Sequence, residues 1–110
     1  LNKQGGPNWF KNWCVAPIIV DEENDEVYFT PIYYTLSHFS KFIRPEAKVI
    51  NVENSDKDLL VTAAENLDGT IAVVLFNEGT TSKNISLSLN DKNVAIQIQG
   101  QAIQTLVITN

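Results

Sequence analysis

The chain has 110 residues and a net charge of −5 at pH 7, and 44% of its residues are hydrophobic. This length and composition are typical of one globular domain and exclude a disordered or fibrous chain. The acidic balance disfavours nucleic acids and acidic membranes as partners, and no apolar run approaches the roughly 20 residues of a membrane-spanning helix.

Cys14 is the single cysteine of the chain. It cannot form an internal disulfide, and one thiol cannot alone make a zinc site. We expect it to be a small buried side chain, and we expect no cofactor or metal ion. Leu1 is not an initiator methionine and no signal-peptide pattern follows it, so we expect the gene product to begin upstream.

Residues 16–20 (APIIV) form a continuous apolar and β-branched run. Such a run is typical of a strand covered on both faces, as in the parallel sheet of an α/β domain. Residues 21–26 (DEENDE) are rich in carboxylates. They lack the central glycine and the twelve-residue ligand spacing of an EF-hand. We therefore expect a solvated turn there in preference to a calcium site.

An amphipathic helix is predicted to begin at residues 30–31 (TP) and to end at residues 44–45 (RP). Threonine caps free backbone N–H groups, and proline suits the first helical position. The residue before a proline is driven out of the helical region, which ends the helix. We expect the apolar stripe on one face to be core; it consists of Ile32, Leu36, Phe39 and Ile43.

From residue 47 the hydrophobic period changes from 3.6 to 2, which predicts short strands with one wet and one dry face. A hairpin is expected at residues 66–69 (NLDG), because Asp-Gly supplies the positive φ angles of a tight turn. Short strands joined by polar turns indicate an antiparallel sandwich or a partly open barrel. The predicted strands span about residues 47–53, 58–65, 70–77, 83–89, 93–99 and 102–109.

Longer motifs lie in three parts of the chain. Residues 5–12 read GGPNWFKN and are followed by APIIVD, residues 33–45 read YYTLSHFSKFIRP, and residues 68–77 read DGTIAVVLFN. Together these motifs resemble the C-terminal portion of glycoside hydrolase family 30, glucosylceramidase-like type. The first two are long and specific, and Phe76 interrupts the third where the family places Leu directly before Asn. The resemblance covers nearly the whole chain.

In this family a (β/α)8 barrel is joined to a β-sandwich that is completed by a strand from before the barrel. The resemblance implies that residues 1–45 form the last loop, strand and helix of the barrel, and that residues 46–110 form the C-terminal sandwich. The expected fold is therefore mainly β: an antiparallel β-sandwich with one N-terminal amphipathic helix and a barrel remnant. The implied function is that of the structural part of a retaining hydrolase of β-glucosidic bonds, such as that of glucosylceramide.

The resemblance places the two catalytic glutamates of the family on earlier barrel strands, so we assign no catalytic residue to this chain. A retaining glycosidase needs two carboxyl groups about 5 to 5.5 Å apart, and the chain alone should be inactive. Asn12 and Trp13 match positions at the mouth of the family's barrel, where an amide can bind a sugar hydroxyl and an indole can stack on a sugar face. In the alternative interpretation, Asn12 only caps a turn and Trp9 and Trp13 only pack.

His38 is the only histidine of the chain and could be considered as an acid or base. No acidic orienting residue or nucleophile elbow accompanies it, so we expect a hydrogen bond from the helix to the sandwich instead. Asn84 begins an Asn-Ile-Ser sequon, which would be glycosylated only on a eukaryotic secretory route. The family resemblance implies a secreted or lysosomal-type location.

The implied partners are a β-glucoside bound through the parent barrel and the rest of the hydrolase chain, without nucleic acid. Loss of the barrel would bare strand edges and apolar faces, so the isolated fragment should self-associate through Trp9, Phe10 and Trp13. The alternative function is a carbohydrate-binding sandwich without hydrolase activity. Coplanar exposed aromatics would mark it, yet Phe76 is the one aromatic in the predicted strands. A third hypothesis is an interaction domain related to the hydrolase only by ancestry.

Overall fold

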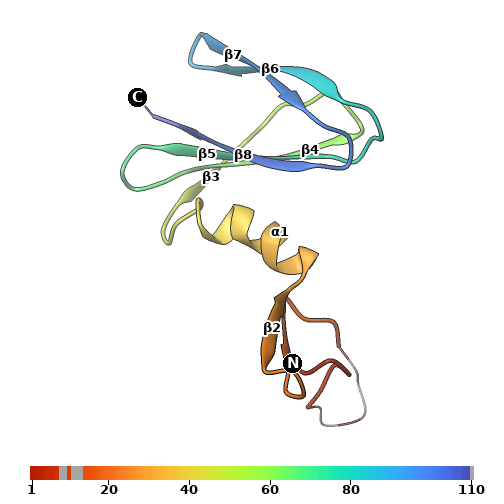
Figure 1. The fold of residues 1–110 in the computed structure, drawn as a ribbon. Helices are drawn as coiled ribbons and strands as arrows, with labels where there is room; N and C mark the ends of the chain where they lie inside the picture. The colour runs from red at the N-terminus through yellow and green to blue at the C-terminus, as the bar shows by residue number, and fades with distance from the viewer. Residues whose placement is uncertain (8–9, 11–13, 110) are drawn as a thin grey trace. The chain divides into compact units, whose positions relative to one another are not determined.

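The computed structural model describes residues 1–7, 10 and 14–109. The chain divides into two compact units, residues 1–37 and residues 38–110. In the described residues, strands predominate and α1 is the helix (Figure 1). This confirms the mainly β prediction with one helix near the N-terminus.

The first unit is built on an antiparallel hairpin of β1 (Ile18–Asp21) and β2 (Glu26–Phe29). The turn between them includes Asp25, whose φ of 53° is left-handed. A single parallel bridge joins Asn2 to Val20. The prediction that this strand is covered on both faces is therefore wrong for the described residues, in which its strand partner is antiparallel. Residues 26–29, for which the sequence predicts no strand, fold back on β1 and pair with it in the antiparallel sense.

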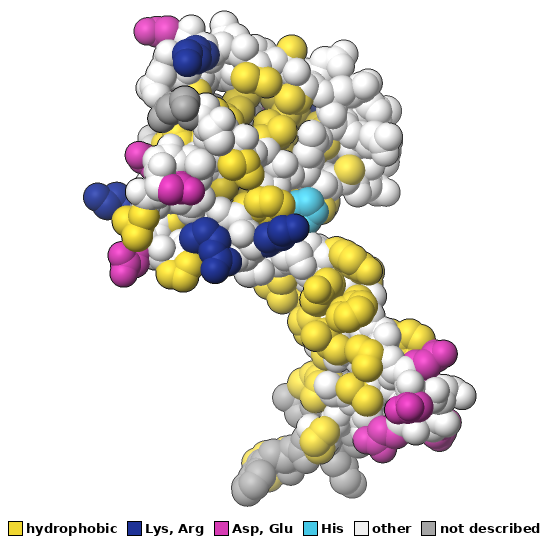
Figure 2. Space-filling model, turned by 60° about the vertical axis from the view of Figure 1, so that its left-hand side comes forward, with side chains coloured by type: hydrophobic (Ala, Val, Ile, Leu, Met, Phe, Trp, Pro, Cys, Tyr) yellow, Lys and Arg dark blue, Asp and Glu magenta, His cyan; other side chains and the backbone are white. Residues whose placement is uncertain are grey.

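Apolar side chains lie at the surface of this first unit, where Figure 2 also shows acidic side chains gathered on one side. Ile18 and Val20 of β1 are 41% and 42% exposed, and Phe29 of β2 is 50% exposed. The ring of Phe29 lies 4.6 Å from that of Tyr33, measured between centroids. The described residues of this unit thus form aromatic contacts without enclosing an extended core.

The helix α1 (Pro31–Ser40) begins where the sequence predicts. The threonine before it acts differently from the expected cap. The Thr30 hydroxyl donates to the carbonyls of Ala16 and Pro17 at 2.8 and 3.1 Å, and its carbonyl accepts the Tyr33 N–H at 2.9 Å. The side chain of Thr30 therefore fastens the helix start to the segment that precedes β1.

The helix ends at Ser40, four residues earlier than predicted. The backbone N–H of Arg44 donates to Oδ1 of Asn66 at 2.9 Å, and the Arg44 guanidinium donates to the Ser40 carbonyl at 2.9 Å. These bonds replace the continuation of the helix. No residue of α1 is buried, and Phe39 is 37% exposed, so the prediction of a core stripe is wrong.

The second unit contains a four-stranded antiparallel sheet in the order β3-β4-β5-β8 and a two-stranded sheet of β6 and β7 (Figure 1). The predicted strands are confirmed to within three residues at each end, and β6 has the predicted bounds. The β6–β7 hairpin packs over the larger sheet as a sandwich. The bounds are β3 Lys48–Ile50, β4 Leu59–Glu65, β5 Ile71–Asn77, β6 Lys83–Leu89, β7 Lys92–Ile98 and β8 Ile103–Ile108.

The central strand β5 is buried on both faces. Its odd-numbered apolar residues, Val73 and Leu75 among them, pack toward β6 and β7 in the core cluster. Val74 lies on the other face, beside Thr105 of β8. The β4–β5 turn is the predicted hairpin: Gly69 has a φ of 84° and its N–H donates to the Asn66 carbonyl at 3.0 Å. The left-handed angle explains the need for glycine there.

Candidate functional site

The loop that contains the predicted sugar-binding residues begins at a tight turn. The Gly5 N–H donates to the Asn2 carbonyl at 3.0 Å, and the φ of Gly5 is 85°. The side-chain Oδ1 of Asn2 accepts the N–H groups of Gln4 and Gly6 at 3.1 and 2.9 Å. The Asn2 N–H also donates to the Gly6 carbonyl at 2.7 Å. One asparagine therefore organises the whole turn.

The other end of this loop returns to the same turn. The Cys14 N–H donates to the Gly5 carbonyl at 3.3 Å, so residues 5 and 14 close a loop. The turn itself is fastened to β1, because the Val20 N–H donates to the Leu1 carbonyl at 2.8 Å. We call residues 1–6 the stem of the 5–14 loop. The stem fixes where this loop leaves and rejoins the hairpin.

Asn12 and Trp13, the predicted sugar contacts, lie outside the described residues. Their role stays a prediction. Phe10 is 82% exposed. Cys14 is also exposed, so the prediction that it is buried is wrong. Its backbone N–H closes the loop by hydrogen bonding to Gly5.

Asp21, at the end of β1, is the centre of a polar cluster and is only 2% exposed. Its Oδ1 accepts the Glu23 and Asn24 backbone N–H groups at 3.2 and 3.3 Å and lies 3.1 Å from Nζ of Lys3. Its Oδ2 accepts the Asn24 side-chain amide at 2.9 Å and lies 3.3 Å from the Tyr28 hydroxyl. Residues 22–25 are exposed as expected of a solvated turn, but Asp21 is not.

This cluster shifts two pKa values in opposite directions. Hydrogen bonding from the Asn24 side chain, aided by Lys3 and opposed by burial, lowers the pKa of Asp21 to about 2. The hydroxyl of Tyr28 donates to Oε2 of Glu26 at 2.7 Å, and this bond is the main reason that the pKa of Tyr28 is raised to about 12. At neutral pH Asp21 is therefore a fixed anion and Tyr28 a fixed donor. The described residues contain no group of three or more His, Cys, Asp or Glu side chains that could hold a metal ion.

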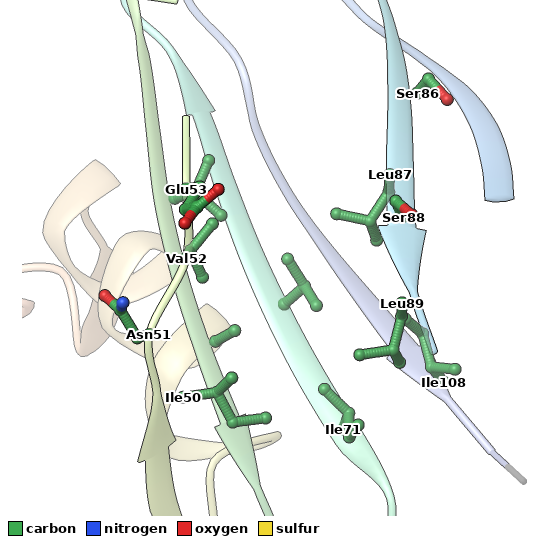
Figure 3. A pocket seen from close by; sticks show the side chains of 13 residues that line it. Ile50, Asn51, Val52, Glu53, Ile71, Ser86, Leu87, Ser88, Leu89 and Ile108 are labelled. Atoms are coloured by element: carbon green, nitrogen blue, oxygen red, sulfur yellow. The ribbon is translucent and has the colours of Figure 1, made fainter. Parts of the chain in front are cut away.

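An apolar groove of about 330 Å³ opens between the two sheets of the sandwich. Figure 3 shows Leu87 and Leu89 of β6 pointing across it toward Val52 and Ile71. Four polar residues, Asn51, Glu53, Ser86 and Ser88, also line it. Its apolar lining comes from both sheets and from the segment after β3: Ile50, Val52, Val61, Ala63, Ile71, Val73, Leu87, Leu89 and Ile108.

The outer face of the β6–β7 hairpin is the other surface where a carbohydrate could bind. It carries small and polar side chains, which include Asn84, Ser86, Ala95 and Gln97. Sugar-binding surfaces use aromatic rings that stack on apolar sugar faces. Phe76 of β5 is partly buried. The described sandwich therefore offers no aromatic platform of the kind that the carbohydrate-binding alternative needs.

His38 is the first residue of the second unit, and it forms a hydrogen bond with β8. Its Nδ1 is 2.7 Å from the Thr105 hydroxyl, and this hydroxyl also donates to the His38 carbonyl at 3.4 Å. The predicted bond from the helix to the sandwich is confirmed. Nearby, the Asn66 side chain donates to the Phe42 carbonyl at 2.9 Å while accepting from Arg44. The role of Asn66 outside its turn could not be predicted, since nothing in a hairpin motif shows that its first residue also reaches a distant segment.

Comparison with protein families decides the relationship of this chain. The glycosyl hydrolase family 30 β-sandwich domain matches residues 46–106, more than half of the chain, and the TIM-barrel domain of the same family matches residues 1–43. The chain belongs to glycosyl hydrolase family 30. The predicted resemblance is thereby confirmed, as are the sandwich and the barrel remnant.

Individual relatives agree with this family assignment. The chain is 41% identical over 96 residues to the lysosomal acid glucosylceramidase of Mus musculus, covering 86% of this chain and 18% of that protein. Among solved structures it resembles SrfJ from Salmonella typhimurium, with a TM-score of 0.95 and 30% identity over 100% of this chain and 25% of that one. It also resembles the endo-β1,6-glucanase BT3312, with a TM-score of 0.83 and 27% identity over 96% of this chain and 24% of that one.

This family 30 chain thus spans about a fifth to a quarter of the length of these relatives. With ten residues, α1 is too short to cross a membrane, and the described part of the chain contains no other candidate span.

Proposed function

We propose that this chain is the C-terminal part of a retaining β-glycoside hydrolase of the glucosylceramidase type, which cleaves β-glucosidic bonds. The observation that carries the proposal is the order of the two matches, with a barrel segment at residues 1–43 followed directly by a sandwich at residues 46–106. The mouse relative is named a glucosylceramidase, whereas BT3312 is an endo-β1,6-glucanase. Glucosylceramide is therefore one candidate substrate within a broader class of β-glucosides.

In this proposal the chemistry and the sugar contacts come from different parts of the protein. Retaining hydrolysis requires an acid and a nucleophile about 5 to 5.5 Å apart, and we assign both to barrel strands outside residues 1–110. The 5–14 loop supplies Asn12 and Trp13 to the sugar. Its closure between Gly5 and Cys14, and its attachment to β1, support this role because a binding loop needs a fixed base.

The apolar groove supports a second role, as the contact with the rest of the hydrolase chain. We propose that a strand from before the barrel lies in it, against Leu87 and Leu89, and completes the smaller sheet. In the isolated chain the groove would remain open, and apolar surface of this kind promotes association. We therefore expect the isolated chain to self-associate. Light scattering at micromolar concentration tests this, and a monomer mass that does not change on dilution would contradict it.

A secreted or lysosomal-type location fits the name of the mouse relative. Asn84 is exposed on β6, as a glycosylated asparagine must be. In a eukaryotic secretory host, removal of N-glycans should increase the electrophoretic mobility of the protein, and Asn84→Gln should abolish that change.

Activity measurements test the proposed function. The purified 110-residue chain should release no 4-methylumbelliferone from its β-glucoside, whereas the longer hydrolase should release it. In the longer protein, Asn12→Ala and Trp13→Ala should each raise KM, and Asn93→Ala, at an exposed position of β7, should not. Turnover by the short chain alone would overturn the proposal. If the short chain binds sugar and the longer protein shows no hydrolase activity, the carbohydrate-binding module is favoured.

A further inference from the structure

The buried carboxylate of Asp21 contacts two structures at once. Its turn partners, Glu23 and Asn24, belong to the β1–β2 connection and follow it directly in the sequence. Its ion-pair partner Lys3 belongs to the stem of the 5–14 loop, and the Nζ to Oδ1 distance is 3.1 Å. The hydrogen bonds of the turn would suffice to satisfy the carboxylate. Lys3 therefore adds a connection that the hairpin itself does not need.

Lys3 lies in the turn to which both ends of the 5–14 loop are attached. Lys3 stands inside the Asn2–Gly5 turn, whose last residue is also the acceptor for the Cys14 N–H. An ion pair at Lys3 therefore restrains both ends of the loop relative to β1. Lys3 is 38% exposed and lies 3.4 Å from Oε2 of the exposed Glu23, while Asp21 is only 2% exposed. Apart from Lys3, the buried carboxylate is bonded by two backbone N–H groups and the Asn24 amide, so it can act as an anchor for the more exposed lysine.

We propose that Asp21 and Lys3 form a stem lock that positions the 5–14 loop for sugar binding, with Asp21 as a positioning residue. The inference rests on the proposed function for its ligand. It goes beyond that function in naming residues that do not touch the sugar. A mutation that raises KM and leaves kcat unchanged has removed binding that substrate and transition state share equally, and loosening the stem of a binding loop should have this effect.

Lys3 separates this role from support of the turn, which makes it the residue to change. Lys3→Met removes the ion pair and leaves every bond of the Asp21 turn in place. Lys3→Arg keeps the charge and has room to reach the carboxylate from a part-exposed position. Lys83→Met is the matched control, because Lys83 forms a comparable ion pair with Asp56, at 2.6 Å, in the sandwich.

The measurements are made on the full-length hydrolase. Lys3→Met and Asp21→Asn should raise KM for 4-methylumbelliferyl β-glucoside roughly tenfold with kcat changed less than about twofold. Lys3→Arg should restore most of the loss, and Lys83→Met should leave KM unchanged. Hydrogen–deuterium exchange of the peptide covering residues 1–14 should be about tenfold faster in Lys3→Met, as expected when a local restraint is removed.

The two readouts distinguish failure of the lock from failure of the proposed function. If Lys3→Met leaves both KM and exchange unchanged, or lowers thermal stability while KM stays the same, the stem lock is wrong. If the wild-type hydrolase cleaves no β-glucoside, the proposed function is wrong and exchange decides the lock: faster exchange in Lys3→Met, but not in Lys83→Met, supports it, and unchanged exchange overturns it.

Discussion

The two units of this chain are stabilised in different ways. Of the buried hydrophobic side chains in the described residues, Ala16 alone lies in residues 1–37, and the other nine lie in the sandwich. The first unit holds its shape by the side-chain and backbone hydrogen bonds of Asn2 and by the cluster around Asp21. The second unit holds its shape by a core around Leu75. Apolar burial stabilises the sandwich, and polar contacts stabilise the loop stem.

This difference separates the two units by the kind of change that should disrupt each. A sandwich with its own core needs its large apolar residues. A unit whose apolar residues remain exposed, such as Val27 at 53%, depends on hydrogen bonds and on further surface to cover it. The latter is the property expected of the barrel part in the proposed function.

The largest effect should come from the centre of β5. Leu75 is 0% exposed and belongs to the core cluster, so Leu75→Ala should lower the free energy of unfolding by about 2 to 5 kcal/mol. Urea denaturation followed by far-UV circular dichroism measures this loss. Leu67→Ala is the control, because Leu67 is 74% exposed in the β4–β5 turn, and its cost should stay within about 0.5 kcal/mol. Equal losses in the two variants would show that the sandwich core is not the stabilising element.

A smaller effect should come from the hydrogen bonds that join Asn66 to Phe42 and Arg44, which we call the polar clamp. Asn66→Ala leaves the Phe42 carbonyl and the Arg44 N–H without their partner. Unpaired, partly buried backbone groups of this kind cost about 1 to 3 kcal/mol. The same denaturation experiment measures it, with Asn93→Ala at an exposed position of β7 as the control. A loss as small as that of the control would mean that water replaces the clamp without cost.

The sandwich was the part of the fold that sequence reasoning predicted well. The alternation in residues 83–89 and 92–98, and the Asp-Gly turn before β5, are local signals, and the structure shows the corresponding strands. The burial of the strands was harder to predict. The apolar run at 16–20 predicts a strand covered on two faces, and the strands after residue 47 are predicted to have one wet face each. In the structure the described residues do not cover β1 on both faces, whereas β5 is buried on both. The sequence pattern shows which faces of a strand are apolar, but whether those faces are buried depends on the segments that pack against them.

The candidate site could be predicted only in outline. The 5–12 motif and the residue after it predict Asn12 and Trp13 as sugar contacts, and this role is still a prediction. Contacts between residues far apart in the sequence could not be predicted. Lys3 of the loop stem pairs with Asp21, 18 positions away, and Asn66 of the sandwich bonds to Phe42, 24 positions away. The acidic residues 21–26 were all predicted to lie in a solvated turn. No local pattern shows that the first of their carboxylates is buried.

The smallest effect is local and concerns the acid response of the first unit. The pKa of Asp21 is lowered to about 2 from 3.8, first by the Asn24 side chain. A carboxyl with a lower pKa in the folded state stabilises that state when ionised, so its contribution is complete above about pH 4 and is lost as the pH falls through about 2. Three other charged groups are close to this carboxyl. Lys3 pairs with it directly, and the same lysine pairs with Glu23. The Tyr28 hydroxyl lies between the Asp21 and Glu26 carboxylates.

The backbone amide of Asn24 reports this titration, because its N–H donates to Oδ1 of Asp21. Its NMR shift should change with a midpoint near pH 2, and the change should disappear in Asp21→Asn. Glu23→Gln and Glu26→Gln control for the other carboxylates of the cluster and should leave the midpoint in place. A midpoint near the ordinary aspartate value would mean that Asp21 is not held as an ion by its neighbours. The first unit would then depend on apolar contacts, as the sandwich does.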